Sequence, residues 1–281
     1  MGLFDIFKKK SAETTPQSIA PNQPAIQFVS LFYENKPEIN PDAILAELKQ
    51  RFANVEPLQI DGTTAFAFPD FMTDFNGVNV PAQGLVLNTD VEIDLDKYKD
   101  AIADSIQWSG AEDAMKKCRY QVSVTELMSK GLPHQARLEF FNTLVCAVVQ
   151  ATGAQVVYYR NSNKLLDATK FMEACDAQEP EFLEGAMNFR LFELSNGEIL
   201  MDTLGLHAYG IADFQCSFRK YEAHEIAGML NMLAYYVVDT GDFIRDNTTV
   251  QGIGKNPVWK TRYEASKVEP TRQVVTVIPN Y

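Results

Sequence analysis

Histidine is scarce in this chain and cysteine is thinly spread, and both shortages restrict its chemistry. Only 3 histidines and 4 cysteines occur among 281 residues, and no two cysteines form a CxxC pair. Cys146 and Cys216 lie in apolar stretches, where cysteine usually behaves as a small buried hydrophobic residue. The sequence therefore predicts reduced thiols and excludes a His-rich metal site, and we expect no metal and no cofactor.

Long apolar runs are missing as well. No segment approaches the ~18 uninterrupted apolar residues of a membrane span. Residues 1–10 do not form a signal peptide, because their short apolar run is followed by three lysines instead of being preceded by charge. They could give only marginal attachment to a membrane surface. We interpret residues 1–25 as an amphipathic peptide and a flexible linker, attached to a cytoplasmic protein.

The motifs of common enzymes are also absent. Residues 252–255 read Gly-Ile-Gly-Lys, but Asn256 follows where a phosphate-binding P-loop needs Ser or Thr. His224-Glu225 begins like a zinc-protease helix, yet Gly228 stands in the place of the second histidine. No Gly-x-Ser-x-Gly elbow occurs, so an α/β-hydrolase nucleophile is excluded. An enzyme would need an unfamiliar site.

Positive charge is in deficit, with 25 Lys and Arg against 37 Asp and Glu, a net charge of −12. Such a field repels nucleic-acid phosphates, so we expect no nucleic-acid partner, but it attracts a basic protein. Residues 90–113 hold eight acids and two lysines. A solvated acidic face is the favoured interpretation, and a docking patch for a basic partner is the alternative. The candidate contacts of that patch are Asp94, Asp96, Asp100 and Asp104.

Helices and strands follow from the spacing of apolar residues. Steps of three and four predict helices at about 41–53, 95–106, 133–152, 168–175 and 223–238. We expect Asn40 to cap the first of these helices, Gly153 to end the third, and Asp61-Gly62 to form a hairpin-type turn between two strands. Extended segments are predicted at 26–34, 55–60, 63–68, 119–126, 155–159, 188–194, 198–201 and around 214–218. Val91, Ile93 and Leu95 alternate with acids, a pattern typical of an edge strand with an acidic outer face.

This element order predicts an α+β fold. Three passes of strand, helix and strand favour a mixed, largely antiparallel sheet with helices packed mainly on one side, or two ferredoxin-like halves. We expect an N-terminal α+β half over residues 26–128 and a C-terminal half over residues 129–281.

Two groups of residues are candidates for recognition or chemistry in the C-terminal half. His207, Tyr209 and Asp213 follow a Gly-containing loop, where a loop base, an aromatic hydroxyl and a carboxylate could form an active site with the acidic turn at 239–246. A structural histidine is the more common situation. The aromatics expected to be exposed for partner recognition, along with Tyr209, are Trp259, Tyr263 and Tyr281.

Residues 203–252 carry a recognisable signature. It consists of Thr-x-Gly-Leu at 203–206, the step from Gly210 to Asp213, an apolar helix ending in Asp-Thr-Gly-Asp at 239–242, and Asp-x-Thr-x-x-Gln-Gly at 246–252. This pattern resembles the C-terminal core of a bacterial family described as domain of unknown function 4261. The resemblance extends less specifically over residues 26–278. Asn247 departs from it where a glycine is expected.

The resemblance implies a bacterial, cytoplasmic α+β domain with no established activity, from a group whose relatives occur near contact-dependent toxin and immunity genes. The net charge of −12, the acidic run at residues 90–113 and the absence of a catalytic motif lead us to expect a binding protein. In its most specific form it is an immunity-type protein that neutralises a basic toxin through an acidic surface. The alternative is an enzyme of unknown reaction with a site near His207, Tyr209 and Asp213.

Overall fold

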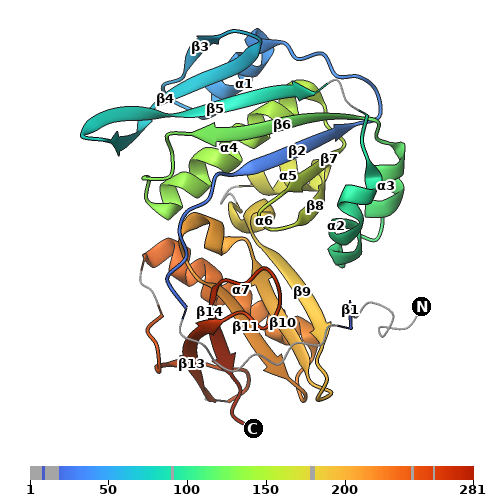
Figure 1. Ribbon diagram of the computed structural model, residues 1–281, viewed down its shortest axis with the longest axis vertical. Helices are drawn as coiled ribbons and strands as arrows, with labels where there is room; N and C mark the ends of the chain where they lie inside the picture. Colours follow the sequence, from blue (N-terminus) through green and yellow to red (C-terminus); the bar gives the residue numbers. More distant parts are fainter. Residues whose placement is uncertain (1–7, 10–18, 90–91, 178–180, 242–243, 256) are drawn as a thin grey trace. The chain divides into compact units, whose positions relative to one another are not determined.

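The computed structural model describes residues 8–9, 19–89, 92–177, 181–241, 244–255 and 257–281 (Figure 1). The expectations for residues 1–7 and 10–18, Asp90, Val91 and Asp242 concern residues outside this description. The chain forms two compact units. Residues 25–186 make the N-terminal unit, and residues 187–281, together with the described residues before Ala25, make the C-terminal unit.

A seven-stranded antiparallel sheet forms the N-terminal unit. Its strands, in spatial order, are β3 (Glu56–Ile60), β4 (Thr63–Phe75), β5 (Val78–Thr89), β6 (Tyr120–Leu127), β2 (Phe28–Tyr33), β7 (Val156–Tyr159) and β8 (Lys164–Asp167). The Asp61-Gly62 turn joins β3 to β4 as the sequence predicted. The long β4–β5 hairpin turns at Asn76 and Gly77, which both have positive φ angles of 56° and 81°.

Helices cover both faces of this sheet. One face packs against α1 (Pro41–Arg51), α4 (His134–Thr152) and α5 (Ala168–Cys175), and the short α6 (Leu183–Ala186) follows. The other face packs against η2 (Leu95–Tyr98), α2 (Lys99–Asp104) and α3 (Ala111–Lys117). Alternation within β2 explains this arrangement, because Leu31 faces the first core and Phe32 the second.

Local sequence signals set the ends of the main helices. The Asn40 side chain accepts from the backbone N–H groups of Asp42 and Ala43, which caps α1. Gly153 ends α4 in the left-handed conformation, with φ 68°. Both signals were expected from the sequence. None of the helices in the described part of the chain has the length and apolarity to cross a membrane.

The predicted acidic edge strand is wrong over its described part. Residues 92–94 are irregular, and Leu95 begins η2. The Asp94 side chain accepts from the backbone N–H of Asp96 at 3.2 Å, so it caps the helix where the alternating pattern predicted strand pairing. Local capping by aspartate therefore prevails over the period-two pattern.

The C-terminal unit has a second, mixed seven-stranded sheet. In spatial order the strands are β1 (Lys8–Lys9), β9 (Asn188–Glu193), β10 (Ile199–Leu204), β11 (Asp213–Phe218), β14 (Gln273–Ile278), β13 (Val258–Ala265) and β12 (Thr249–Gln251). The pairs β1–β9 and β11–β14 are parallel and the others antiparallel. The long helix α7 (Ala223–Thr240) contacts β10 and β11 (Figure 1).

The two faces of this sheet differ in polarity. One face carries buried apolar side chains, including Phe214, Cys216 and Val275. The opposite face carries Asp202, Gln215 and other polar groups, which bind the segment between β13 and β14. The helix therefore covers an apolar face, and the connecting segment covers a polar one.

These two sheets confirm the α+β fold, with 7 α-helices among the described residues. The chain divides at Ala186, whereas the sequence placed the boundary after residue 128. The reason is that α4, β7, β8 and α5 complete the sheet and core of the N-terminal unit.

A buried ionic network as the candidate functional site

Asp213 lies at the centre of a buried polar network at the start of β11. Its side chain is fully buried, and it accepts from several groups of the preceding loop and strand. Among them are the Leu206 N–H at 3.0 Å, the Thr203 hydroxyl at 3.2 Å and His207 Nδ1 at 2.7 Å. A buried carboxylate needs such partners because leaving water is costly. Asp213 therefore fixes the loop that carries η3 (Leu206–Tyr209).

Arg272 links Asp213 to a second buried carboxylate. Its Nε donates to Asp213 Oδ2 at 2.8 Å and its Nη2 donates to Asp202 Oδ2 at 2.7 Å. Arg190, which is the register partner of Asp202 on β9, donates to both Asp202 oxygens, at 3.0 and 2.5 Å. Two guanidinium groups thus balance two carboxylates in a site where only His207 is appreciably exposed.

Burial alone would raise the pKa of Asp213, but Arg272 and His207 outweigh it and hold that pKa well below its ordinary value of 3.8. Burial would likewise lower the pKa of Arg272, and Asp213 and Asp202 raise it above its ordinary value. These partners therefore favour the ionised form of Asp213 and the protonated form of Arg272. A cluster of mutually paired charges of this kind stabilises one arrangement of strands.

His207 is the one member of the network that could act on a solute. Its side chain is 22% exposed. Asp213 accepts a hydrogen bond from His207 Nδ1, so a neutral His207 ring carries its proton on Nδ1. Its Nε2 is then an acceptor. This tautomer is inferred from the hydrogen bond. No described residue donates to Nε2. An aspartate-oriented imidazole of this kind can serve as a general base.

Two of the aromatic side chains that were predicted to be exposed are buried. Tyr209 and Trp259 were expected to be exposed, but they are 4% and 0% exposed. The ring of Trp259 packs 5.0 Å from that of Tyr221, and Gly252 lies directly against its indole. The turn residues that flank β13 suggested that Trp259 would be exposed. In the structure, the side of β13 that carries Trp259 is covered. Tyr281 is 58% exposed, as expected, and Tyr263 is half-buried.

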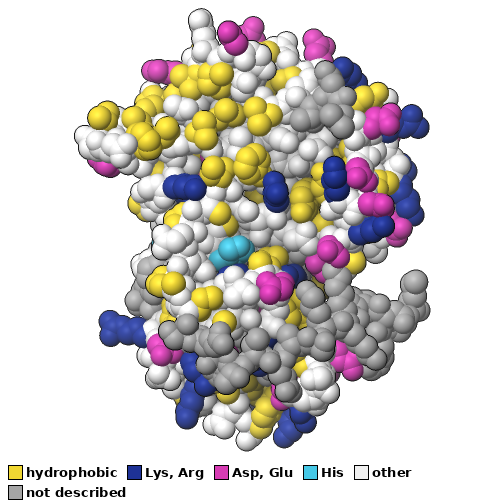
Figure 2. Space-filling model, in the orientation of Figure 1, with side chains coloured by type: hydrophobic (Ala, Val, Ile, Leu, Met, Phe, Trp, Pro, Cys, Tyr) yellow, Lys and Arg dark blue, Asp and Glu magenta, His cyan; other side chains and the backbone are white. Residues whose placement is uncertain are grey.

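The four acidic candidates lie in the N-terminal unit, on or beside η2 and α2. Asp94, Asp96 and Asp100 are exposed, and Asp104 is half-buried and accepts from Asn163 at 3.0 Å. Lysines lie among them: Lys99 pairs with Asp96 at 2.8 Å, and Lys97 lies 3.8 Å from Asp94. Figure 2 shows acidic and basic side chains side by side in the region of α2 and α3. The structure brings these four acids together, but in a different unit from His207, Tyr209, Asp213 and Trp259.

The acidic turn after α7 does not join His207 in the described structure. Asp246 instead accepts from the Tyr263 backbone N–H at 2.8 Å and from Asn247. In the parts of the chain described here, His, Cys, Asp and Glu form no group of three that could hold a metal ion.

Three members of the network, Arg190, Asp202 and Arg272, were missed by reasoning from the sequence. A signal was available for one of them, because Asp202 is the single charge in the mostly apolar strand β10, and buried charges of that kind are paired. Arg272 lies 59 residues from Asp213, and nothing local predicts that contact.

Comparisons with known proteins bear on this unit. Residues 202–278 match the family model described as "Domain of unknown function (DUF4261)". Neither the curated proteins nor the solved structures contain a match to the chain. The matched segment includes Asp202, His207, Asp213 and Arg272, and it lies within the C-terminal unit. Residues 202–278 are therefore similar to this domain of unknown function, and the match confirms the resemblance that residues 203–252 carry.

Proposed function

We propose that the protein functions by binding a basic protein partner through the acidic surface formed by Asp94, Asp96, Asp100 and Asp104. The distribution of charge carries this proposal. Residues 25–186 hold 24 acids and 13 bases, a net charge of −11, whereas the rest of the chain holds 13 acids and 12 bases, a net charge of −1. Nearly all the negative field thus originates in one unit, and it would attract a basic partner to that unit.

Within this unit the charge is most concentrated around η2, α2 and α3. Residues 92–113 contain seven acids and two lysines, a net charge of −5. The lysine pairs with Asp96 and Asp94 are exposed, and exposed pairs are weak enough to exchange for pairs with a partner. A basic protein could therefore replace them without leaving a buried charge unpaired.

The ionic network of the C-terminal unit favours binding over catalysis. Its two arginines and two aspartates are already matched to each other, and such groups maintain a rigid scaffold. In its most specific form, the proposal is an immunity-type protein of the bacterial cytoplasm that covers the active surface of a basic toxin. The four cysteines, none of which forms a disulfide, are in keeping with that compartment.

Affinity capture with a charge variant tests this proposal. The variant D94N/D96N/D100N/D104N removes four negative charges, and asparagine still caps η2 at position 94. We expect the wild-type protein to retain a stoichiometric basic partner from a lysate of the source cells at low salt. The variant is expected to retain roughly tenfold less of it, as for a steered association.

A matched control removes the same charge elsewhere in the N-terminal unit. The control variant is E34Q/E38Q/E56Q/D61N, whose four positions are exposed and lie outside the acidic surface. It lowers the negative charge of the unit by the same amount as the first variant, so a difference between the two variants reports the position of the charges. Retention by the control and loss by the first variant would support the proposed surface. Equal capture by both variants, or no stoichiometric partner for the wild type, would rule it out.

A second candidate function is an enzyme that uses His207 as a general base. The observation in its favour is the 2.7 Å contact between His207 Nδ1 and the fully buried Asp213. If the protein hydrolyses esters, phosphoesters or peptides, H207Q should lower the rate by about 100-fold or more. H224Q is the matched control, since His224 is exposed on the first turn of α7. An unchanged rate in H207Q, or no turnover by the wild type in the three substrate classes, would eliminate this candidate.

A further inference from the structure

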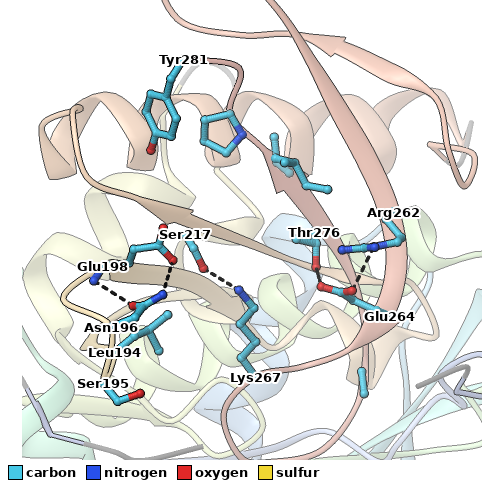
Figure 3. Close-up of a pocket in the computed structure, with 14 residues that line it drawn as sticks. Leu194, Ser195, Asn196, Glu198, Ser217, Arg262, Glu264, Lys267, Thr276 and Tyr281 are labelled. Carbon is cyan, nitrogen blue, oxygen red and sulfur yellow. Dashed lines mark hydrogen bonds and ion pairs between the residues drawn. The ribbon is translucent and has the colours of Figure 1, made fainter. Parts of the chain in front are cut away.

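A cavity of about 420 Å³ opens on the C-terminal unit, at the ends of β9, β11, β13 and β14 (Figure 3). Its volume falls within the ~300–1,000 Å³ range of small-molecule sites. One wall holds Asn196 and Glu198, the opposite wall holds Arg262 and Glu264, and the Lys267 side chain lies between them. Leu194, Ile278, Pro279 and the exposed ring of Tyr281 add apolar surface.

The carboxylates around this cavity already have partners. Glu264, which is buried, accepts from the Thr276 hydroxyl at 2.6 Å, and its other oxygen lies 3.1 Å from Arg262 Nε, an ion pair with a poor angle for a hydrogen bond. Glu198 lies 3.3 Å from Arg219 Nε and accepts from Asn196 at 2.9 Å. Neither carboxylate neutralises the remaining cation of the cavity.

That remaining cation is Lys267. Its ammonium donates to the neutral Ser217 hydroxyl at 2.8 Å, and no carboxylate of the described residues lies within 4.0 Å of it. An ammonium offers three donors, so a hydroxyl on one of them leaves two available to a ligand. The half-buried position of Lys267 makes a charge-assisted bond there stronger than one in open solvent.

The backbone around Lys267 is held before any ligand arrives. Its N–H donates to Gln215 Oε1 at 3.0 Å, and the adjacent Val268 packs with Phe192 and Leu200. On the other side, the Ser266 N–H donates to the carbonyl of Arg272, which belongs to the buried network. A site fixed in this way loses little conformational freedom on binding.

We propose that this cavity binds a small organic monocarboxylate, with its carboxylate on Lys267 and Ser217 and its apolar body against Tyr281 and the neighbouring aliphatic side chains. The charge balance favours one negative charge over two. The lining residues Lys267, Arg262, Glu198 and Glu264 sum to zero, and Arg219 behind Glu198 leaves an excess of +1. A phosphate dianion would bring excess negative charge close to two carboxylates. This site is independent of the proposed acidic surface.

Binding measured by amide chemical shifts tests the proposal, with acetate, hexanoate and benzoate as probes and inorganic phosphate in parallel. For the wild-type protein, we expect saturable shifts of residues lining the cavity, with hexanoate and benzoate binding more tightly than acetate. K267Q should weaken binding of every carboxylate by about 10- to 100-fold, as expected for loss of a charged hydrogen bond. K267R, which keeps the charge, should remain within a few-fold of the wild type.

Two further variants separate the cavity from general effects. K255Q removes one exposed lysine of the same unit outside the cavity and should leave binding unchanged. Y281A removes the exposed ring at the end of the cavity, together with its contacts to the Arg219 N–H and Tyr221, and leaves Lys267 and Ser217 in place. It should weaken hexanoate and benzoate but leave acetate unaffected. Equal carboxylate binding by K267Q and the wild type, tighter binding of phosphate, or no saturable shift would overturn the proposal. If K267Q does not fold, equal benzoate binding by Y281A and the wild type would overturn the proposal.

Discussion

Replacing Arg272 with methionine is expected to lower the free energy of unfolding by about 3–5 kcal/mol. Methionine preserves much of the side-chain volume but removes the guanidinium that bridges Asp202 and Asp213, both of which are fully buried. Two carboxylates would then lie in the interior with a single guanidinium, that of Arg190. Urea unfolding of the purified variant, followed by circular dichroism, measures the change.

An exposed arginine of the same unit provides the control for Arg272. The Arg219 side chain is 53% exposed and pairs with Glu198, so R219M should cost less than about 1 kcal/mol. Equal losses of stability in R219M and R272M would contradict the assignment of Arg272 to a buried, mutually dependent network.

The pH dependence of unfolding gives a second measure of the same network. Asp213 has a lower pKa in the folded protein than its ordinary value of 3.8. Its charge therefore contributes stability that is fully present above that ordinary pKa, and this stability is lost as pH falls through the folded pKa. R272M removes the largest favourable contribution to this shift, so its stability should depend less on pH below about 4 than that of the wild type.

The second large effect is expected at Gly252, at the end of the family signature. A Cβ at this position would lie 2.3 Å from Trp259 Nε1 and 2.4 Å from Cδ1. Because Trp259 is fully buried, its indole cannot move away without disturbing the core. We expect G252A to lower the free energy of unfolding by about 3 kcal/mol, at the upper end of the usual overpacking cost.

The same substitution in α7 should have the opposite sign. Gly228 is exposed in the interior of the helix, and a Cβ there would have no neighbour within 4 Å. G228A is therefore expected to raise the free energy of unfolding by about 0.5–1 kcal/mol. Thermal and urea unfolding of both variants check the pair. Destabilisation by G228A, or no destabilisation by G252A, would show that the packing around these glycines differs from that described.

The parts of the fold that were predictable depend on local signals. The Asn40 cap, the Gly153 stop and the Asp61-Gly62 turn act within a few residues, and each has the expected structure. The strand β5 was missed, because Pro81 and the small residues that follow it obscure its alternation. The helix α3 was missed as well, since its 7 residues are too few for a clear period.

In the candidate site, too, contacts between residues close in sequence were predictable, and contacts that depend on strand order were not. His207 and Asp213 lie 6 residues apart along the chain, and their association could be predicted. Arg190 and Arg272 reach the network only because β9, β10, β11 and β14 are neighbours in the sheet, and strand order cannot be deduced from single elements. Trp259 was wrongly expected to be exposed, because burial of a β13 side chain depends on Gly252 and Tyr221, which lie elsewhere in the sequence.

Binding through the acidic surface is tested most directly by the association rate of the purified complex at two salt concentrations. For the wild-type protein we expect the rate to fall steeply as salt rises from about 50 to 200 mM, because the attraction is screened. The variant D94N/D96N/D100N/D104N should associate slowly with little dependence on salt, and E34Q/E38Q/E56Q/D61N should behave much more like the wild type. The same steep salt dependence in all three proteins would contradict a role for this surface.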